Sequence, residues 1–113
     1  MNSTNIQEQV KEVVQKYTLE ISPELRYIDL TSEVGELGKE LLKATQYGKK
    51  EFNITDNTDN TESEIGDVLF STICIANSLD IDIEKALNGV IKKYEDRFNY
   101  KGSIGLEHRI NNN

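Results

Sequence analysis

Two pairs of carboxylates in this sequence share a three-residue spacing: Glu33 with Glu36, and Glu64 with Asp67. Residues three apart on an α-helix lie on one face, with β-carbons about 5–6 Å from each other, so each pair directs its oxygens toward one point. Like charges at this separation repel each other unless a cation lies between them. Hard divalent ions such as Mg²⁺ or Mn²⁺ take oxygen ligands of this kind, so the two pairs together predict a metal site.

Two cations further along the chain could form the other half of such a site. Lys93 and Arg97 share a helical line with Ala86 and Val90, which places both cations on the apolar side of a helix expected over residues 83–98. Cations that face an apolar interior need anionic partners. Acids that hold metal ions, with cations opposite them, predict a site for phosphate chemistry.

The first acid pair lies on a helix expected from residue 23 to about residue 47. Ser22 and Pro23 are typical of a helix start. Apolar residues then recur at steps of three and four, which predicts one buried stripe. The stripe consists of Tyr27, Leu30, Val34, Leu37, Leu41 and Ala44. Glu33 and Glu36 border it, so the acids are expected at the edge of the core.

The second acid pair lies on a helix expected over residues 61–79, which is apolar over most of its circumference and therefore surrounded by neighbours. One narrow polar line interrupts it. The line consists of Glu64, Asp67, Ser71, Cys74 and Ser78. Among apolar neighbours the Asp67 carboxylate would lose much of its solvation, so it needs a metal or a cation beside it.

Two further helices complete an all-α fold. One is expected over residues 4–17, where Thr4 and Gln7 match a capping box, and one runs from Asp82, an N-cap, to residue 98. The polar run 49–60 is expected to be a loop that covers the site. No segment shows strand alternation, so the predicted protomer is a four-helix antiparallel bundle, completed by dimerisation.

The length and net charge of the chain limit the number of domains and the kinds of partner that it can have. The 113 residues suit one domain, 1–113, with a core over about 22–105 and a mobile tail at 106–113. A net charge of −7 argues against a broad nucleic-acid surface. No apolar run is long enough for a membrane span and no signal peptide is recognisable, so a soluble, cytoplasmic protein is expected.

Cys74 is the only cysteine, so no internal disulfide can form, and a small buried side chain is expected.

Purely structural roles remain open for each acid. Glu33 and Glu36 could form a solvated acidic edge, together with Glu40, in which nearby lysines pair at four-residue spacing for about 0.2–0.5 kcal/mol each. Glu64 could close a capping box three residues after Thr61. Asp67 could form a buried ion pair with one of the two inward cations.

Three segments resemble, in order, the signature blocks of MazG-like nucleotide pyrophosphohydrolases, in the all-α NTP pyrophosphatase superfamily. They are residues 30–37, 64–70 and 93–98. Residues 43–48 and 101–105 are similar to the short, single-domain members, and the resemblance covers about residues 25–105. Each acid pair is common on its own, but the order, spacing and helical context of the blocks are specific together.

The resemblance implies Mg²⁺-dependent hydrolysis of a ribo- or deoxynucleoside triphosphate to the monophosphate and pyrophosphate, with Mn²⁺ as a second candidate metal. By matching position, the metal ligands would be Glu33, Glu36, Glu64 and Asp67. Lys93 and Arg97 would hold the phosphate chain and act in catalysis. Asn77 and Lys101 would contact the substrate.

The mechanism that follows is attack of activated water on the α-phosphorus, with pyrophosphate leaving. The general base would be Glu33 or Glu36. Many members carry two adjacent glutamates where this chain has Ser32 and Glu33, which leaves the number of metal ions open. The chain has no tryptophan to stack on a base, so Tyr47, Phe52 or Tyr100 would have to serve.

A homodimer is expected, because the helix over residues 61–79 is more apolar than a single four-helix unit requires, and a dimer of dimers is an alternative. The nearest rival functions are a phosphoribosyl-ATP pyrophosphohydrolase and a dUTPase-like enzyme. From another class, the chain could be a non-catalytic helical dimer module with a structural acid cluster. The cellular role would be nucleotide housecleaning or a regulatory one.

Overall fold

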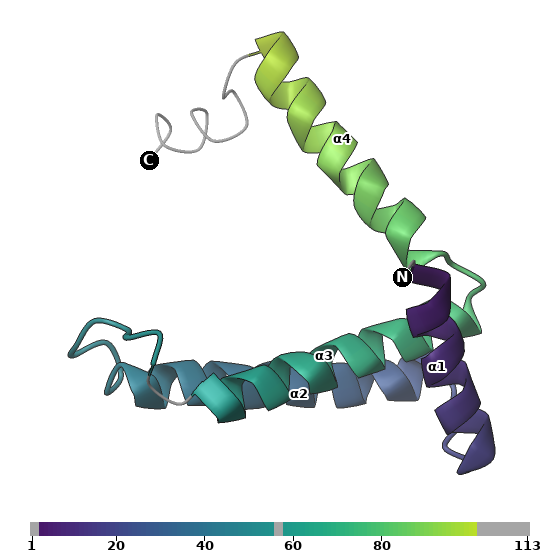
Figure 1. The fold of residues 1–113 in the computed structure, drawn as a ribbon, viewed down its shortest axis with the longest axis horizontal. Coiled ribbons are helices and arrows are strands. Elements are labelled where there is room, and N and C mark those ends of the chain that lie inside the picture. The colour runs from purple at the N-terminus through teal and green to yellow at the C-terminus, as the bar shows by residue number, and fades with distance from the viewer. Residues whose placement is uncertain (1–2, 56–57, 102–113) are drawn as a thin grey trace. The chain divides into compact units, whose positions relative to one another are not determined.

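Within the residues that the structure describes, the protein forms four α-helices. The computed structural model describes residues 3–55 and 58–101, and these contain no strand. The helices are α1 (Ser3–Lys16), α2 (Pro23–Ala44), α3 (Thr58–Ser78) and α4 (Ile83–Lys101) (Figure 1). None of them, as described, is long and apolar enough to cross a membrane. The predicted all-α, four-helix class is confirmed, whereas the tail 106–113 lies outside the described residues.

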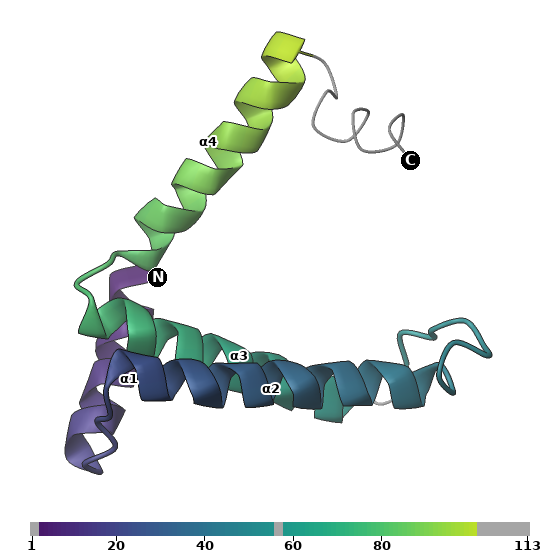
Figure 2. The same ribbon diagram turned by 180° about the vertical axis from the view of Figure 1, so that it is seen from behind.

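The chain forms two compact units, which are described here one at a time. Residues 1–81 carry α1, α2 and α3, and residues 82–113 carry α4. In the first unit α2 and α3 run antiparallel, side by side along most of their length, and α1 packs against α3 (Figures 1 and 2). The most buried side chains lie mainly on the second half of α3. They are Ser71, Ile73, Cys74 and Ala76, with Ala44 at the end of α2.

Three helix ends differ by three residues from the predicted ones, and one of them is the end of α4, which lies at Lys101 and not at residue 98. α2 stops at Ala44, three residues early, because Gln46 and Tyr47 adopt left-handed backbone conformations with φ of 51° and 60°. The Tyr47 amide donates to the Leu42 carbonyl at 2.7 Å and so closes the last turn. α3 begins at Thr58, three residues earlier than predicted.

A pair of amide side chains joins α1 to the end of α3. Gln7 Nε2 donates to Asn77 Oδ1 and to the Ile81 carbonyl, both at 2.9 Å, and Asn77 Nδ2 donates back to the Gln7 carbonyl at 3.1 Å. Gln7, predicted to close a capping box with Thr4, therefore holds together segments about 70 residues apart. Asn77, predicted to contact substrate, already has both ends of its amide engaged.

We expect Asn77→Ala to lower the free energy of unfolding by about 1–3 kcal/mol, because the Gln7 side chain loses one of its two acceptors and the Gln7 backbone carbonyl loses the Asn77 donor. Urea unfolding followed by circular dichroism measures this. Asn88→Ala, at an exposed position of α4, is the control and should change stability by less than about 0.5 kcal/mol. Equal effects of the two substitutions would contradict a clamping role for Asn77.

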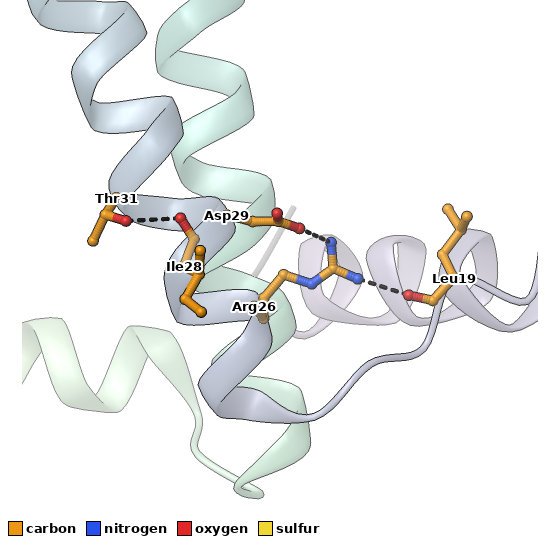
Figure 3. Close-up of polar contacts among 5 residues, drawn as sticks. All are labelled: Leu19, Arg26, Ile28, Asp29 and Thr31. Carbon is orange, nitrogen blue, oxygen red and sulfur yellow. Dashed lines mark hydrogen bonds and ion pairs between the residues drawn. The ribbon is translucent and has the colours of Figure 1, made fainter.

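The connection between α1 and α2 is held by Arg26. Its guanidinium donates to the Leu19 carbonyl at 2.7 Å and to Asp29 Oδ2 at 3.4 Å (Figure 3). One turn later, the Thr31 hydroxyl donates to the Ile28 carbonyl at 2.7 Å (Figure 3). These bonds fix the first turns of α2, and so the helix that carries Glu33.

α4 begins as predicted at an aspartate cap. Asp82 Oδ1 accepts the backbone amides of Glu84 and Lys85 at 2.9 and 3.1 Å, which confirms the predicted N-cap. One side of α4 is apolar, through Leu87, Val90, Ile91, Tyr94 and Phe98. The Lys93 ammonium lies 5.4 Å, and the Arg97 guanidinium 5.6 Å, from the centre of the Tyr94 ring. The two cations therefore border the apolar side together.

Candidate metal centre

Three of the four predicted metal ligands come together between α2 and α3. One carboxylate oxygen from each of Glu33, Glu64 and Asp67 lies within 4.8 Å of the other two. The antiparallel pairing explains this, because it sets the middle of α2 beside the first half of α3 (Figure 1). Oxygens this close could all bind one cation.

Burial within the group is unequal, and it differs from the expectation. Glu33 and Glu64 are partly buried, whereas Asp67 is exposed. Asp67 was predicted to lose its solvation, and this was wrong. The reason is that the most buried part of α3 lies further along, at residues 71–76. Solvent reaches Asp67, so an ion pair is not needed to replace lost solvation.

Burial and neighbouring charges both act on the glutamates of this group. Partial burial, followed by the charges of Asp67 and Glu64, raises the pKa of Glu33, which also shares a hydrogen bond with Asp67. Partial burial, followed by the charges of Asp67 and Glu36, raises the pKa of Glu64. A bound cation would relieve this repulsion.

One oxygen of Glu64 has no partner of its own. Glu64 Oε2 is enclosed and accepts no hydrogen bond within the described part of the chain, and the same holds for Thr61 Oγ1. The capping-box alternative for these two residues is wrong, because α3 begins at Thr58 and Thr61 lies inside the helix. An enclosed carboxylate oxygen without a donor is costly, and a cation would supply the missing partner.

The other two acids of α2 lie around this group. Glu36 is exposed and is not one of the three clustered residues, but its charge contributes to the raised pKa of Glu64. Glu40 Oε2 lies 3.6 Å from Lys43 Nζ, so a neighbouring cation balances its charge. Glu40 is therefore paired locally, at three-residue and not the expected four-residue spacing, although its Oε1 accepts no hydrogen bond within the described residues, and these residues show no such pair for Glu33.

The raised pKa values predict how stability depends on pH. Glu33 and Glu64 bind protons more tightly in the folded protein than in the unfolded chain. Their contribution should therefore lower the stability of the metal-free protein as the pH rises from 4.5, the usual glutamate value, to the raised values. Urea unfolding in the presence of a chelator measures this between pH 4.5 and 7. The urea midpoint of the wild-type protein should fall over this range relative to the midpoint of the double variant Glu33→Gln/Glu64→Gln. Parallel profiles for the two proteins would contradict it.

The polar line of α3 continues from the acids into a cavity of about 190 Å³. α1, the segment before α2, the start of α2 and the end of α3 enclose it. The walls are formed by Lys11, Val14, Gln15, Glu20, Ile21, Arg26, Cys74, Asn77 and Ser78. Cys74 lies seven residues beyond Asp67, about 10 Å along the helix axis. Burial raises the pKa of the Cys74 thiol, so Cys74 is a neutral wall residue.

The aromatic residues predicted to stack on a base are scattered. Phe52 lines a separate apolar cavity of about 330 Å³ with Ile54, Thr61, Glu62 and Ile65. At 100° per residue, Ile65 is about 160° round α3 from Asp67, but Thr61 is only about 60° from Glu64, so this cavity borders the acid group on the side of Glu64. Tyr47 is 68% exposed, and the side chain of Tyr100 lies outside the described residues.

The remaining predicted site residues lie on α4, in the second unit. Lys93 and Arg97 share one side of that helix, and Lys101 ends it, although its side chain lies outside the described residues. Their part in a site therefore remains a prediction from sequence.

A family model completes these observations. The MazG nucleotide pyrophosphohydrolase domain matches residues 21–101, which include the four predicted metal ligands and the two predicted phosphate-binding cations, Lys93 and Arg97. The chain belongs to the MazG nucleotide pyrophosphohydrolase family. The resemblance seen in the sequence is thereby confirmed, and this MazG protein is a hydrolase.

Individual relatives agree with the family assignment. The uncharacterized protein YpjD of Bacillus subtilis (strain 168) is 43% identical over 76 residues, which cover 67% of each chain. A crystal structure of YpjD from Bacillus subtilis matches with a TM-score of 0.69 and 37% identity, over 83% of this chain and 95% of that one. The crystal structure of the Bacillus-conserved MazG protein, a nucleotide pyrophosphohydrolase, matches with a TM-score of 0.67 and 36% identity. The match covers 83% of this chain and 89% of that one.

Proposed function

We propose that this MazG protein is a Mg²⁺-dependent nucleoside triphosphate pyrophosphohydrolase, which converts a ribo- or deoxynucleoside triphosphate to the monophosphate and pyrophosphate. The observation that carries the proposal is the convergence of the Glu33, Glu64 and Asp67 oxygens within 4.8 Å. In a family that hydrolyses nucleotides, such a group suits a metal that binds phosphates. Mn²⁺ is the alternative metal.

The residues present fit a hard divalent ion. All the donors are carboxylate oxygens, two of the carboxylates have raised pKa values, and Glu64 Oε2 lacks a partner among the described residues. Glu33, Glu64 and Asp67 would hold the ion, with Glu36 beside them. When bound, the ion would neutralise phosphate charge and lower the pKa of water in the site.

Different side chains would bind the phosphates and accept the proton during the reaction. Lys93 and Arg97 would hold the phosphate chain and stabilise charge on the departing pyrophosphate. A water oxygen would bond to the α-phosphorus while the bond from that phosphorus to the α–β bridging oxygen breaks. Glu36 is better placed than Glu33 to accept the water's proton, because it is exposed and lies outside the clustered oxygens.

The nucleoside end of the substrate would occupy the 190 Å³ cavity. The cavity lies about 10 Å along α3 from Asp67, on the same polar line, and a nucleotide could span this distance. Lys11, Gln15 and Ser78 offer polar groups there. Asn77 belongs to the cavity wall, and its bonds to Gln7 would fix the shape of that wall.

We further propose that the whole chain, 1–113, acts as one MazG-like domain, because the family match crosses both units. It would act in the cytoplasm on free nucleotides, in nucleotide housecleaning, without nucleic-acid or membrane partners. It would assemble as a homodimer, with a dimer of dimers as the larger alternative.

Pyrophosphate release across a panel of nucleotides tests the proposal. The panel comprises canonical and damaged ribo- and deoxynucleoside triphosphates, dUTP and phosphoribosyl-ATP, each with Mg²⁺ or with a chelator. We expect Mg²⁺-dependent turnover of nucleoside triphosphates generally. Exclusive turnover of dUTP or of phosphoribosyl-ATP would favour the rival enzymes, and no turnover of any nucleotide would favour a non-catalytic module.

A further inference from the structure

Several polar side chains in the wall of the 190 Å³ cavity already have partners within the chain. Both ends of the Asn77 amide bond to Gln7. The Arg26 guanidinium donates to the connection before α2 and to an aspartate of its own helix (Figure 3). The Ser78 hydroxyl donates to the Cys74 carbonyl at 3.0 Å. These groups fix the shape of the cavity and are not the first that a bound molecule would meet.

Three other polar side chains of the cavity are available to a ligand. Lys11 and Gln15 lie one turn apart on α1, and Glu20 lies in the connection between α1 and α2. Within the described part of the chain, none of these three side chains forms a hydrogen bond or an ion pair. The Lys11 ammonium can only donate, the Glu20 carboxylate can only accept, and the Gln15 amide can do both. The cavity therefore offers one strong donor group and one strong acceptor group to the same molecule.

The rest of the wall suits the faces of a flat ring. Val14 and Ile21 are apolar, and the raised pKa of the Cys74 thiol keeps it neutral. Sites for drug-sized ligands have volumes of about 300–1,000 Å³, so a cavity of 190 Å³ suits a smaller fragment such as a single heterocyclic base.

The common bases differ in how well their edges match a carboxylate. Guanine carries two adjacent donors, N1–H and the N2 amino group, beside the acceptor O6. A carboxylate can accept from both donors at once, and an ammonium can donate to O6. On the pairing edges of adenine, cytosine and uracil, every donor has an acceptor directly beside it, and a carboxylate placed there would be repelled.

We propose, building on the proposed function, that the cavity selects guanine nucleotides and that Glu20 and Lys11 determine this specificity. Glu20 accepts from N1–H and from the N2 amino group, and Lys11 donates to O6. The apolar residues Val14 and Ile21 contact the ring. GTP or dGTP is then the preferred substrate, and other nucleoside triphosphates react more slowly because they leave the Glu20 carboxylate without two donors.

Turnover of GTP, ITP and ATP by the full chain tests this assignment. ITP differs from GTP only in lacking the N2 amino group. The kcat/KM for GTP should exceed those for ITP and ATP at least about 10-fold. Glu20→Ala should remove the difference between GTP and ITP, because the amino group loses its acceptor. Lys11→Ala should lower kcat/KM for GTP and ITP by similar factors, since both carry O6.

Glu12→Ala is the matched control. Glu12 is an exposed acid on α1 that does not line the cavity. The variant should keep the wild-type preference for GTP over ITP within about twofold. Loss of the preference in Glu12→Ala as well as in Glu20→Ala would show that the net charge near the cavity matters and not a contact with Glu20, which would overturn the assignment.

A binding measurement separates this inference from hydrolysis. Cys74 is the only cysteine and lines the cavity, so its reaction with iodoacetamide reports whether the cavity is occupied. In chelator, saturating guanosine should slow this reaction at least about threefold, and adenosine should not, because a ligand that binds the folded state suppresses its opening.

The outcomes distinguish the two proposals. Equal kcat/KM for GTP and ITP, or equal protection by guanosine and adenosine, would overturn the guanine assignment and leave the proposed hydrolysis intact. Protection by guanosine in a protein that hydrolyses no nucleotide would support the guanine assignment and contradict the proposed function.

Discussion

Asp67→Asn should reduce pyrophosphate release on the order of 10³-fold while leaving the metal-free protein as stable as the wild type, or slightly more stable. The two effects have one cause. Asp67 contributes an oxygen to the clustered group, and its charge raises the pKa of both Glu33 and Glu64. Its removal takes away a metal ligand and, with it, a source of repulsion. Turnover and urea unfolding in chelator measure the two effects.

Glu62→Gln is the matched control for this experiment. Glu62 is an exposed acid on the same helix, outside the clustered oxygens. The substitution should leave turnover within about twofold and stability within about 0.5 kcal/mol of wild type. If Asp67→Asn strongly destabilised the metal-free protein, the acids would be part of a structural ion-pair network, and the metal interpretation would fail.

Arg97→Ala should lower kcat/KM about 100-fold or more, through a higher KM, a lower kcat or both. A guanidinium can hold two phosphate oxygens at once, and its charge would stabilise the leaving pyrophosphate. Arg97→Lys should recover only part of the loss, because an ammonium does not reproduce the two-pronged contact. Steady-state kinetics on the preferred nucleotide measure all three proteins.

Lys92→Ala serves as the control on α4. Lys92 is exposed and pairs with Asp96 at 3.0 Å, so its charge is engaged within the same helix. Its loss should change kcat/KM by no more than about twofold, since exposed pairs contribute little. If Arg97→Ala behaved like Lys92→Ala, the proposed phosphate clamp on α4 would be wrong.

Local patterns predicted the elements and the acid group well. A three-residue spacing on each of two neighbouring helices predicted a group of four acids, of which Glu33, Glu64 and Asp67 lie together and Glu36 does not. The Asp82 N-cap could also be predicted from the local sequence, since both backbone amides that it accepts are within three residues.

What escaped prediction depends on contacts between distant segments. No local sequence pattern around Gln7 or Asn77 predicts that their side-chain amides form hydrogen bonds across 70 residues. The exposure of Asp67, and of Val34, a member of the predicted buried stripe that is 51% exposed, was missed for a related reason. Periodicity shows which residues share a side of a helix, but not how many neighbours cover that side. The early end of α2 reflects left-handed conformations that Gln46 and Tyr47 rarely adopt.

Hydrolysis in ¹⁸O-labelled water, followed by mass spectrometry of the products, tests the central claim most directly. If water attacks the α-phosphorus in a site held by Glu33, Glu64 and Asp67, the label will enter the nucleoside monophosphate and the pyrophosphate will remain unlabelled. The reaction should stop when Mg²⁺ is chelated. Label in the pyrophosphate, or release of inorganic phosphate and a nucleoside diphosphate, would contradict the account.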